Sequence, residues 1–186
     1  QIFRDAAAQA RPHVQHALHL SVAAGIRSDS IAQWLGSERI VRAMPNTPAL
    51  VGKGMTGLFA RPAVTAAERD LVEAVVATTG DHVWLAQENH LDAVTALSGS
   101  GPAYVFYFLE AMVQAGTDMG LTEAQARQLA VGTFSGGAAL AGASSDPLQL
   151  LRERVTSKGG TTYAALTSLE TSGVKDAFVR AMQAAQ

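Results

Sequence analysis

Apolar and polar residues alternate in short blocks through the first half of the chain, and these blocks predict strands and helices in turn. Apolar runs bounded by turn residues predict buried strands at residues 18–25, 39–44, 55–60 and 81–86. Helices are expected around them, from residue 2 to about Pro12, over 28–36 and over about 65–79. Strands and helices in alternation are typical of an α/β fold with a parallel sheet.

The second half of the chain follows a different pattern, in which no convincing strand appears after Leu91. Apolar residues at helical spacing predict helices at about 89–97, 101–119, 122–143, 147–155, 162–171 and 174–185. The change of pattern places a domain boundary near residue 88. We therefore expect an α/β domain over residues 1–88 and an all-α domain over residues 89–186.

Several of these helices carry boundary signals. Thr65 opens a T-x-x-E pattern and Thr122 a T-x-x-Q pattern, both typical of a capping box at a helix start. The pair Asp146–Pro147 is interpreted as an N-cap followed by proline. Gly36 closes the predicted helix over residues 28–36.

The long helices of the second half are unusually poor in charge. Between Leu97 and Ser145 the charged residues are Glu110, Asp118, Glu123 and Arg127. Helices that are apolar on every face need burial on every face. We expect them to form an interface between subunits, whereas the alternative is a tightly packed core helix within one subunit.

Composition and charge exclude several classes of function. The net charge of −2 argues against a nucleic-acid surface, and the absence of cysteine excludes disulfides and fits a cytoplasmic location. The N-terminus lacks the features of a signal peptide, and no apolar run predicts a membrane span. The histidines at 13, 16 and 19 would not share one helix face, so no metal site is expected.

The segment RVTSKGGTTYAALTSLE, residues 154–170, gathers hydroxyl groups and glycines at the start of a predicted helix. A helix that begins near Thr162 leaves its first backbone N–H groups unpaired, and the glycines let a ligand approach them. This arrangement predicts a cradle for a carboxylate or phosphate. An ordinary glycine turn with a threonine N-cap explains the same spacing equally well.

Two further segments follow predicted strands, where α/β proteins bind ligands. The segment RAMPNTPALVGKG, residues 42–54, contains two prolines that stiffen the loop and Asn46, which can both donate and accept hydrogen bonds. The segment SVAAG, residues 21–25, ends a strand with side chains small enough for a cofactor to lie against. Tight strand-to-helix turns are the alternative for each segment.

Taken together, three motifs resemble those of the pyrroline-5-carboxylate reductases. They are RAMPNTP at 42–48, ALSGSGPAY at 96–104, and VTSKGGTT at 155–162 followed by ALTSLE, in the order seen in that family. The resemblance implies reduction of 1-pyrroline-5-carboxylate to L-proline with NADPH or NADH, the last step of proline biosynthesis. It also implies a Rossmann domain, an all-α domain that interlocks two subunits into a homodimer, and in some members a ring of dimers.

The resemblance also implies roles for particular residues. The substrate would be surrounded by Ser157, Gly159, Gly160, Thr161 and Thr162. Thr162 would hydrogen-bond the ring nitrogen of the substrate and is the expected catalytic residue. The nicotinamide end of the cofactor would be lined by Val22, Ala23, Ala24, Met44, Pro45 and Asn46. Glu88 corresponds to an acidic residue near the cofactor.

The sequence departs from the family pattern in two places. Lys158 stands where family members usually carry proline, which leaves the flanking donors in place. No G-x-G-x-x-G turn is present, so the chain resembles a reductase without most of its first Rossmann half, on the order of 70 to 80 residues. The alternative function is therefore a non-catalytic helical dimerisation module with a residual anion-binding pocket.

Overall fold

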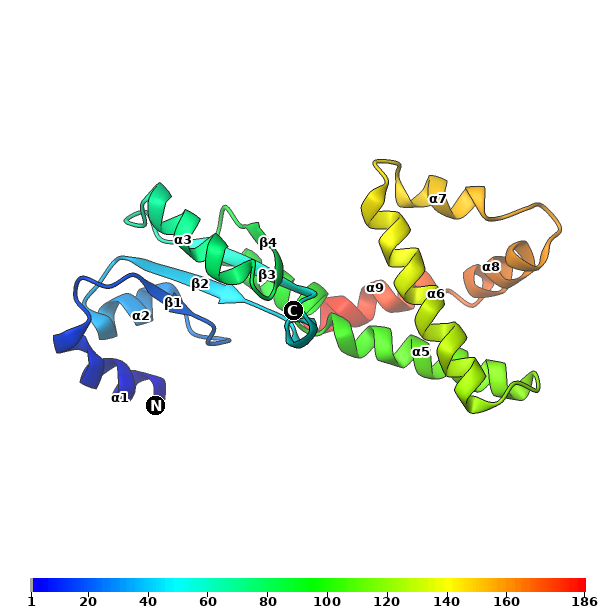
Figure 1. Ribbon diagram of the computed structural model, residues 1–186, viewed down its shortest axis with the longest axis horizontal. Coiled ribbons are helices and arrows are strands. Elements are labelled where there is room, and N and C mark those ends of the chain that lie inside the picture. Colours follow the sequence, from blue (N-terminus) through cyan, green and yellow to red (C-terminus); the bar gives the residue numbers. More distant parts are fainter. Residues whose placement is uncertain (1) are drawn as a thin grey trace. The chain divides into compact units, whose positions relative to one another are not determined.

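The computed structural model describes residues 2–186, which form two compact units (Figure 1). Unit 1 comprises the chain up to Pro102 together with residues 185–186, and unit 2 comprises residues 103–184. The boundary near residue 88 rests on the change of sequence pattern and stays a prediction. Each unit is described by itself.

Unit 1 contains the strands and short helices expected from the first half of the sequence. In chain order they are α1 (Ile2–Ala10), η1 (Arg11–His13), β1 (His19–Ser21), α2 (Ser28–Leu35), β2 (Ile40–Met44), η2 (Thr47–Val51), β3 (Gly54–Ala60), α3 (Ala66–Val76), β4 (Gly80–Trp84), α4 (His90–Val94) and the π-helical turn η3 (Thr95–Gly99). Gly36 closes α2 in the left-handed conformation, with φ of 69°. The side chain of Thr65 opens α3 through a complete capping box with Glu68.

The four strands form one sheet in the order β1-β2-β3-β4. The pairs β1/β2 and β3/β4 are parallel, but β2 and β3 run antiparallel, with Met44 opposite Gly57. The expectation of a fully parallel sheet is therefore wrong. Residues 45–53, which link β2 to β3, are too few for the crossover that parallel neighbours require.

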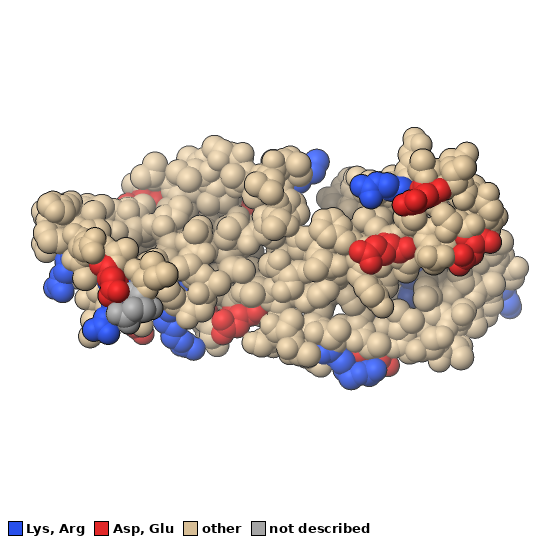
Figure 2. Space-filling view, turned by 90° about the horizontal axis from the view of Figure 1, so that it is seen from below, with Lys and Arg blue, Asp and Glu red and all other residues tan. Residues whose placement is uncertain are grey.

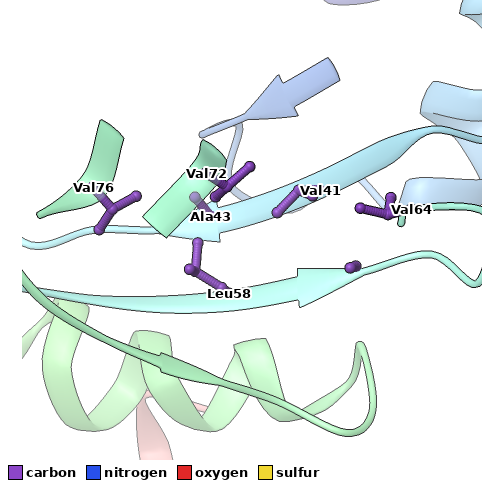
Figure 3. Close-up of a cluster of buried hydrophobic side chains, with 7 residues drawn as sticks. Val41, Ala43, Leu58, Val64, Val72 and Val76 are labelled. Carbon is purple, nitrogen blue, oxygen red and sulfur yellow. The ribbon is translucent and has the colours of Figure 1, made fainter. Parts of the chain in front are cut away.

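Alternating residues of β2 face two separate hydrophobic clusters. One cluster lies under α3 and consists of Val41, Ala43, Leu58, Ala60, Val64, Val72 and Val76 (Figure 3). The other joins α1 and α2 to the opposite face and consists of Ala7, Ile31, Ala32, Leu35 and Ile40. Both faces of the sheet are thus covered, as expected for an α/β fold.

Unit 2 consists of helices joined by turns, with no strand over its described residues. Its helices are α5 (Gly101–Asp118, whose first two residues belong to unit 1), α6 (Glu123–Ala143), α7 (Leu148–Arg154), α8 (Thr161–Thr171) and α9 (Val174–Ala184). The capping box at Thr122 is confirmed. Asp146 does not cap α7: Pro147 occupies the N-cap position, and the Asp146 carboxylate pairs with Arg154 instead.

The helices of unit 2 bury little of their apolar surface. In α5 and α6 the buried residues are Gly116, Ala126 and Ala130. Edge-to-face contacts of Phe178 with Tyr104 and Phe108, at ring-centroid distances of 5.7 and 5.4 Å, join α9 to α5. Large side chains elsewhere on these helices remain exposed, which favours an interface over a closed core.

Lysine and arginine side chains are scattered on the face shown in Figure 2 and form no broad basic surface there. Among residues 2–186, no helix combines the length and the apolar character that a membrane crossing needs.

The packing at Gly80 generates a prediction about stability. Gly80 has φ of 148°, and a Cβ there would lie 2.1 Å from the carbonyl oxygen of Gly54 on the paired strand. We expect Gly80→Ala to lower the free energy of unfolding by about 3 kcal/mol or more, because backbone atoms of two strands must move apart. Urea denaturation of the 186-residue chain measures the loss.

Gly52 provides the matched control, since it also has positive φ, 68°, but nothing lies within 4 Å of a Cβ built on it. Gly52→Ala should cost about 1–2 kcal/mol from backbone strain alone. Equal losses for the two variants would contradict the steric account of Gly80.

Candidate active site

The residues expected at the nicotinamide end of the cofactor lie at one edge of the sheet. Residues 22–24 follow β1, and residues 44–46 comprise the last residue of β2 and the first two residues of the loop after it. Because β1 and β2 are parallel, with Ser21 opposite Arg42, both strands direct their carboxyl ends to the same edge. Val22 is 64% exposed there. The structure therefore brings these six candidates together in the position where α/β proteins bind ligands.

The loop after β2 is held in place by the side chain of Asn46. Its Nδ2 atom donates to the carbonyl oxygen of Ser98 at 3.3 Å and to Ser98 Oγ at 3.1 Å, and its Oδ1 atom accepts from the N–H of Met55 at 2.9 Å. Met44 packs against Gly99, where an added Cβ would lie 2.9 Å from Met44 Cε. The loop is thus joined to both η3 and β3.

Ser98 and Gly99 contact the candidate cofactor loop, and the sequence analysis did not name them among the candidate residues. Both lie in the ALSGSGPAY motif, which served there only to support the family resemblance. Their signal was the pair of glycines around a serine before a proline, which is unusual inside a helical stretch. A π-helical turn such as η3 is frequent at functional sites.

Glu88 lies apart from the Asn46 contacts and is held within unit 1 by the start of α2 and by Arg42. One carboxylate oxygen accepts from the N–H of Ser28 at 2.5 Å and from Arg42 Nη1 at 2.9 Å, and the other accepts from Ser28 Oγ at 2.7 Å. The Glu88 and Arg42 side chains are only 15% and 10% exposed. Both Glu88 oxygens are therefore already engaged by the protein.

These contacts determine how Glu88 titrates. Burial acts to raise the pKa of the Glu88 carboxyl group. The hydrogen bonds from Ser28 and the Arg42 guanidinium outweigh burial, so the net pKa lies below its ordinary value. Glu88 is thus ionised at neutral pH and stabilises the N-terminus of α2.

The turn for which the sequence predicts an anion cradle lies in unit 2 at the start of α8. Gly159 has φ of 77°, and Gly160 occupies the N-cap position with its N–H donated to the carbonyl of Ser157 at 3.0 Å. Because Gly160 is the cap, the alternative of a threonine N-cap is wrong. Ser157, Thr161 and Thr162 are exposed around this turn.

The donors at the start of α8 are free to bind a ligand. None of the hydrogen bonds among residues 2–186 uses the backbone N–H groups of Thr161, Thr162 and Tyr163. Unpaired N–H groups at a helix N-terminus, together with the helix dipole, favour a negatively charged group. No side chain would obstruct an approach over Gly159, because a Cβ there meets nothing within 4 Å. The turn can therefore bind a carboxylate through its backbone.

Comparison with known proteins finds relatives both of the second half of the chain and of its whole length. Residues 88–186 match the pyrroline-5-carboxylate reductase dimerisation family, and the pyrroline-5-carboxylate reductase of Pisum sativum is 37% identical over 186 residues, covering 100% of this chain and 68% of that relative. The chain belongs to the pyrroline-5-carboxylate reductase family. The reductase of Pseudomonas aeruginosa is 43% identical over 169 residues, which cover 90% of this chain and 62% of that relative.

Solved reductase structures share the fold of both units. The Coxiella burnetii reductase covers 98% of this chain at a TM-score of 0.93 and 37% identity, with 68% of its own chain covered. The Plasmodium falciparum reductase, solved with NADP bound, covers 99% at a TM-score of 0.89 and 31% identity, with 74% of its chain covered. This chain thus spans about 62% of the length of the Pseudomonas reductase and somewhat more of the others.

The contacts of Glu88 generate a prediction about pH. A carboxyl group whose pKa is lowered by folding contributes stability that is present above its unfolded pKa of about 4.3 and is lost as the pH falls through the folded value. We expect Glu88→Gln to lower the free energy of unfolding by about 1–3 kcal/mol at pH 7. The difference from wild type should decrease as the pH falls below about 4.3 and disappear below the folded pKa, where the carboxyl group is neutral.

Urea denaturation at several pH values provides the measurement. Asp70→Asn is the matched control, because Asp70 is exposed and makes no hydrogen bond or ion pair among the described contacts. It should change stability by less than about 0.5 kcal/mol at any pH. A Glu88→Gln deficit that persisted unchanged at pH 3 would contradict the assignment to the ionised carboxylate.

Proposed function

We propose that the chain takes part in the reduction of 1-pyrroline-5-carboxylate to L-proline with NADPH or NADH, the last step of proline biosynthesis. The observation that carries this proposal is the open turn at the start of α8, with its unused N–H groups of Thr161, Thr162 and Tyr163. The substrate is a small cyclic imino acid with one carboxylate, which this turn suits in size and charge. Membership of the reductase family supports the assignment.

The substrate carboxylate binds the turn from Ser157 to Thr162, mostly through backbone N–H groups. Gly159 and Gly160 leave room for it, and the hydroxyl groups of Ser157 and Thr161 border the same turn. The Thr162 hydroxyl hydrogen-bonds the ring nitrogen and is the catalytic residue of the proposal. It fixes the orientation of the ring, because a threonine hydroxyl positions well but is a weak acid.

The cofactor binds at the edge of the sheet where β1 and β2 end. Val22, Ala23 and Ala24 are apolar there, and the two alanines are small enough for a flat ring to lie against them. Met44, Pro45 and Asn46 lie beside them at the end of β2. Glu88 contributes to this part of the site indirectly, because its hydrogen bonds hold Arg42 and the start of α2 in place. NADP bound to the Plasmodium falciparum relative supports a nicotinamide dinucleotide, which supplies the hydride when bound.

This reaction needs no strong acid or base from the protein. A protonated imine is already a good hydride acceptor, so accurate positioning of its carbon is the main requirement. The described residues suit this chemistry, because the cradle offers backbone donors and a hydroxyl. No group of three His, Asp or Glu side chains among residues 2–186 is placed to hold a metal ion.

The proposed assembly is a cytoplasmic homodimer formed through the helices of unit 2, with rings of dimers as in some members of the family. Exposed side chains on α5 and α6 include Phe106 at 58%, Tyr107 at 71%, Leu129 at 59% and Leu140 at 71%. Monomeric proteins rarely expose so much contiguous apolar surface. The description of the family that residues 88–186 match, reductase dimerisation, supports this use of the surface.

A second candidate function is a helical dimerisation module without catalysis. It is favoured by one observation, that the family matched by residues 88–186 is described by its role in reductase dimerisation. The two functions are separated with a completed chain, in which the 186 residues are joined to the part of the Pseudomonas aeruginosa reductase they do not match. Oxidation of NADPH with 1-pyrroline-5-carboxylate, followed at 340 nm, supports the reductase, and its absence supports the module.

The cradle generates a prediction for the completed chain. Thr162→Ala should lower kcat/KM for 1-pyrroline-5-carboxylate about 10- to 100-fold, the effect of one lost hydrogen bond in the transition state. The dissociation constant of NADPH should change less than about twofold. Steady-state kinetics and fluorescence titration measure the two quantities.

Thr171→Ala is the matched control, because Thr171 ends the same helix and its hydroxyl only donates to the carbonyl of Thr167. It should leave kcat/KM within about twofold of wild type. If Thr162→Ala weakened substrate turnover and NADPH binding equally, the role assigned to its hydroxyl would be wrong.

The apolar faces of unit 2 generate a prediction about assembly. The 186-residue chain should sediment as a dimer at micromolar concentration, with an interface of about 2,000 Å² or more. Leu129→Glu, in α6, should shift the equilibrium toward monomer, whereas Leu71→Glu, in α3 and equally exposed at 58%, should not. A wild-type chain that sedimented as a compact monomer of 19.4 kDa would refute the assembly.

A further inference from the structure

The amide group of Asn46 is the only side-chain bridge between the loop after β2 and η3 among the described hydrogen bonds. Its two ends face different partners, the N–H of Met55 on one side and the carbonyl and hydroxyl oxygens of Ser98 on the other. A backbone N–H can only donate and a carbonyl can only accept. The orientation of the amide is therefore forced, because a flipped amide would place oxygen against oxygen and N–H against N–H.

The Ser98 carbonyl needs this donor for a reason that lies in the sequence. In a continuous α-helix, that carbonyl would accept from the N–H of residue 102, four positions later. Residue 102 is proline, which has no N–H. The chain instead forms the π-helical turn η3, in which Ser100 donates to Thr95 at 2.8 Å, and Asn46 supplies the hydrogen bond that Pro102 cannot make.

The loop is also fitted to η3 by shape. Met44 Cε occupies the space that a side chain at position 99 would need, since a Cβ there would lie only 2.9 Å away. On β3, Val94 Cγ1 would lie 2.8 Å from a Cβ at position 57, so α4 packs directly on that strand. Met44 and Asn46 thus pack closely against η3, and both make their contacts at or beside its backbone.

We propose that Asn46 is a positioning residue, whose side chain fixes the loop of residues 44–46 against η3 and does not itself bind the cofactor. Its Nδ2 atom donates to Ser98 and its Oδ1 atom already accepts from Met55, so we assign the cofactor contacts of the loop to Met44, Pro45 and the backbone. The fixed loop keeps the nicotinamide ring in the orientation needed for hydride transfer. The catalytic part of this inference rests on the proposed function.

Hydrogen exchange of the 186-residue chain tests the bridge without any activity. Asn46→Ala should increase amide exchange at least about fivefold both at Met55 and at residues 98–101. Asn46→Asp separates the two ends, because the carboxylate still accepts from Met55 but cannot donate to the Ser98 carbonyl. Exchange should then increase at residues 98–101 while Met55 stays protected.

Asn89 supplies the matched controls, since it is exposed and its side chain makes no cap hydrogen bond. Asn89→Ala and Asn89→Asp should leave exchange in both segments unchanged. Wild-type exchange in Asn46→Ala would overturn the bridge. So would an Asn46→Asp variant that opened Met55 and protected residues 98–101.

Kinetics of the completed chain test the positioning role. Asn46→Ala and Asn46→Asp should each lower kcat about tenfold, while KM for NADPH changes less than about threefold, because the loop loses order but no cofactor contact is removed. A rise in KM for NADPH at unchanged kcat would overturn the inference in favour of direct cofactor binding. If the wild-type completed chain is inactive, the proposed function fails, and hydrogen exchange still decides whether the bridge exists.

Discussion

The short link between β2 and β3 is the constraint on which the arrangement of unit 1 depends. Residues 45–53 cannot cross over the sheet, so β3 must return beside β2 in the opposite direction. The helix α3 then carries the chain back, so that β4 runs parallel to β3 and α4 packs on β3. Residues 44–46 lie where β2 passes into this link, and Asn46 is within hydrogen-bonding distance of η3.

A buried ion pair follows from the alternation of side chains along β2. Ile40 and Arg42 face the side covered by α1 and α2, whereas Val41 faces α3. Burying a guanidinium is unfavourable unless a carboxylate and further hydrogen bonds accompany it. Glu88 provides that carboxylate: the oxygen that faces Arg42 also accepts from the Ser28 N–H at the N-terminus of α2, and the other oxygen accepts from the Ser28 hydroxyl. One acidic side chain therefore connects a strand, a helix start and the segment after β4.

The sequence predicted those features that local chemistry determines. Helix bounds were accurate because capping boxes at Thr65 and Thr122 and the glycine after α2 act within a few residues. The predicted direction of β3 was wrong, because an apolar run does not encode the orientation of a strand. The length of the link between β2 and β3 did encode that orientation. Asn46 and Ser98 are 52 positions apart and Ser28 and Glu88 are 60 apart, and no local pattern reveals such pairs. At the start of α8, the sequence analysis identified the glycines and hydroxyl groups. Its alternative placed the N-cap on a threonine, whereas Gly160 occupies that position in the structure.

The two units differ in how they hold the candidate site residues that each of them contains. Unit 1 has its own core, so the loop of residues 44–46 is held by packing and hydrogen bonds within one chain. In unit 2, α7, α8 and α9 contain no fully buried residue, and the turn before α8 has no side-chain cap. A turn with so few internal contacts keeps its donors available to a ligand but adds little to its own rigidity.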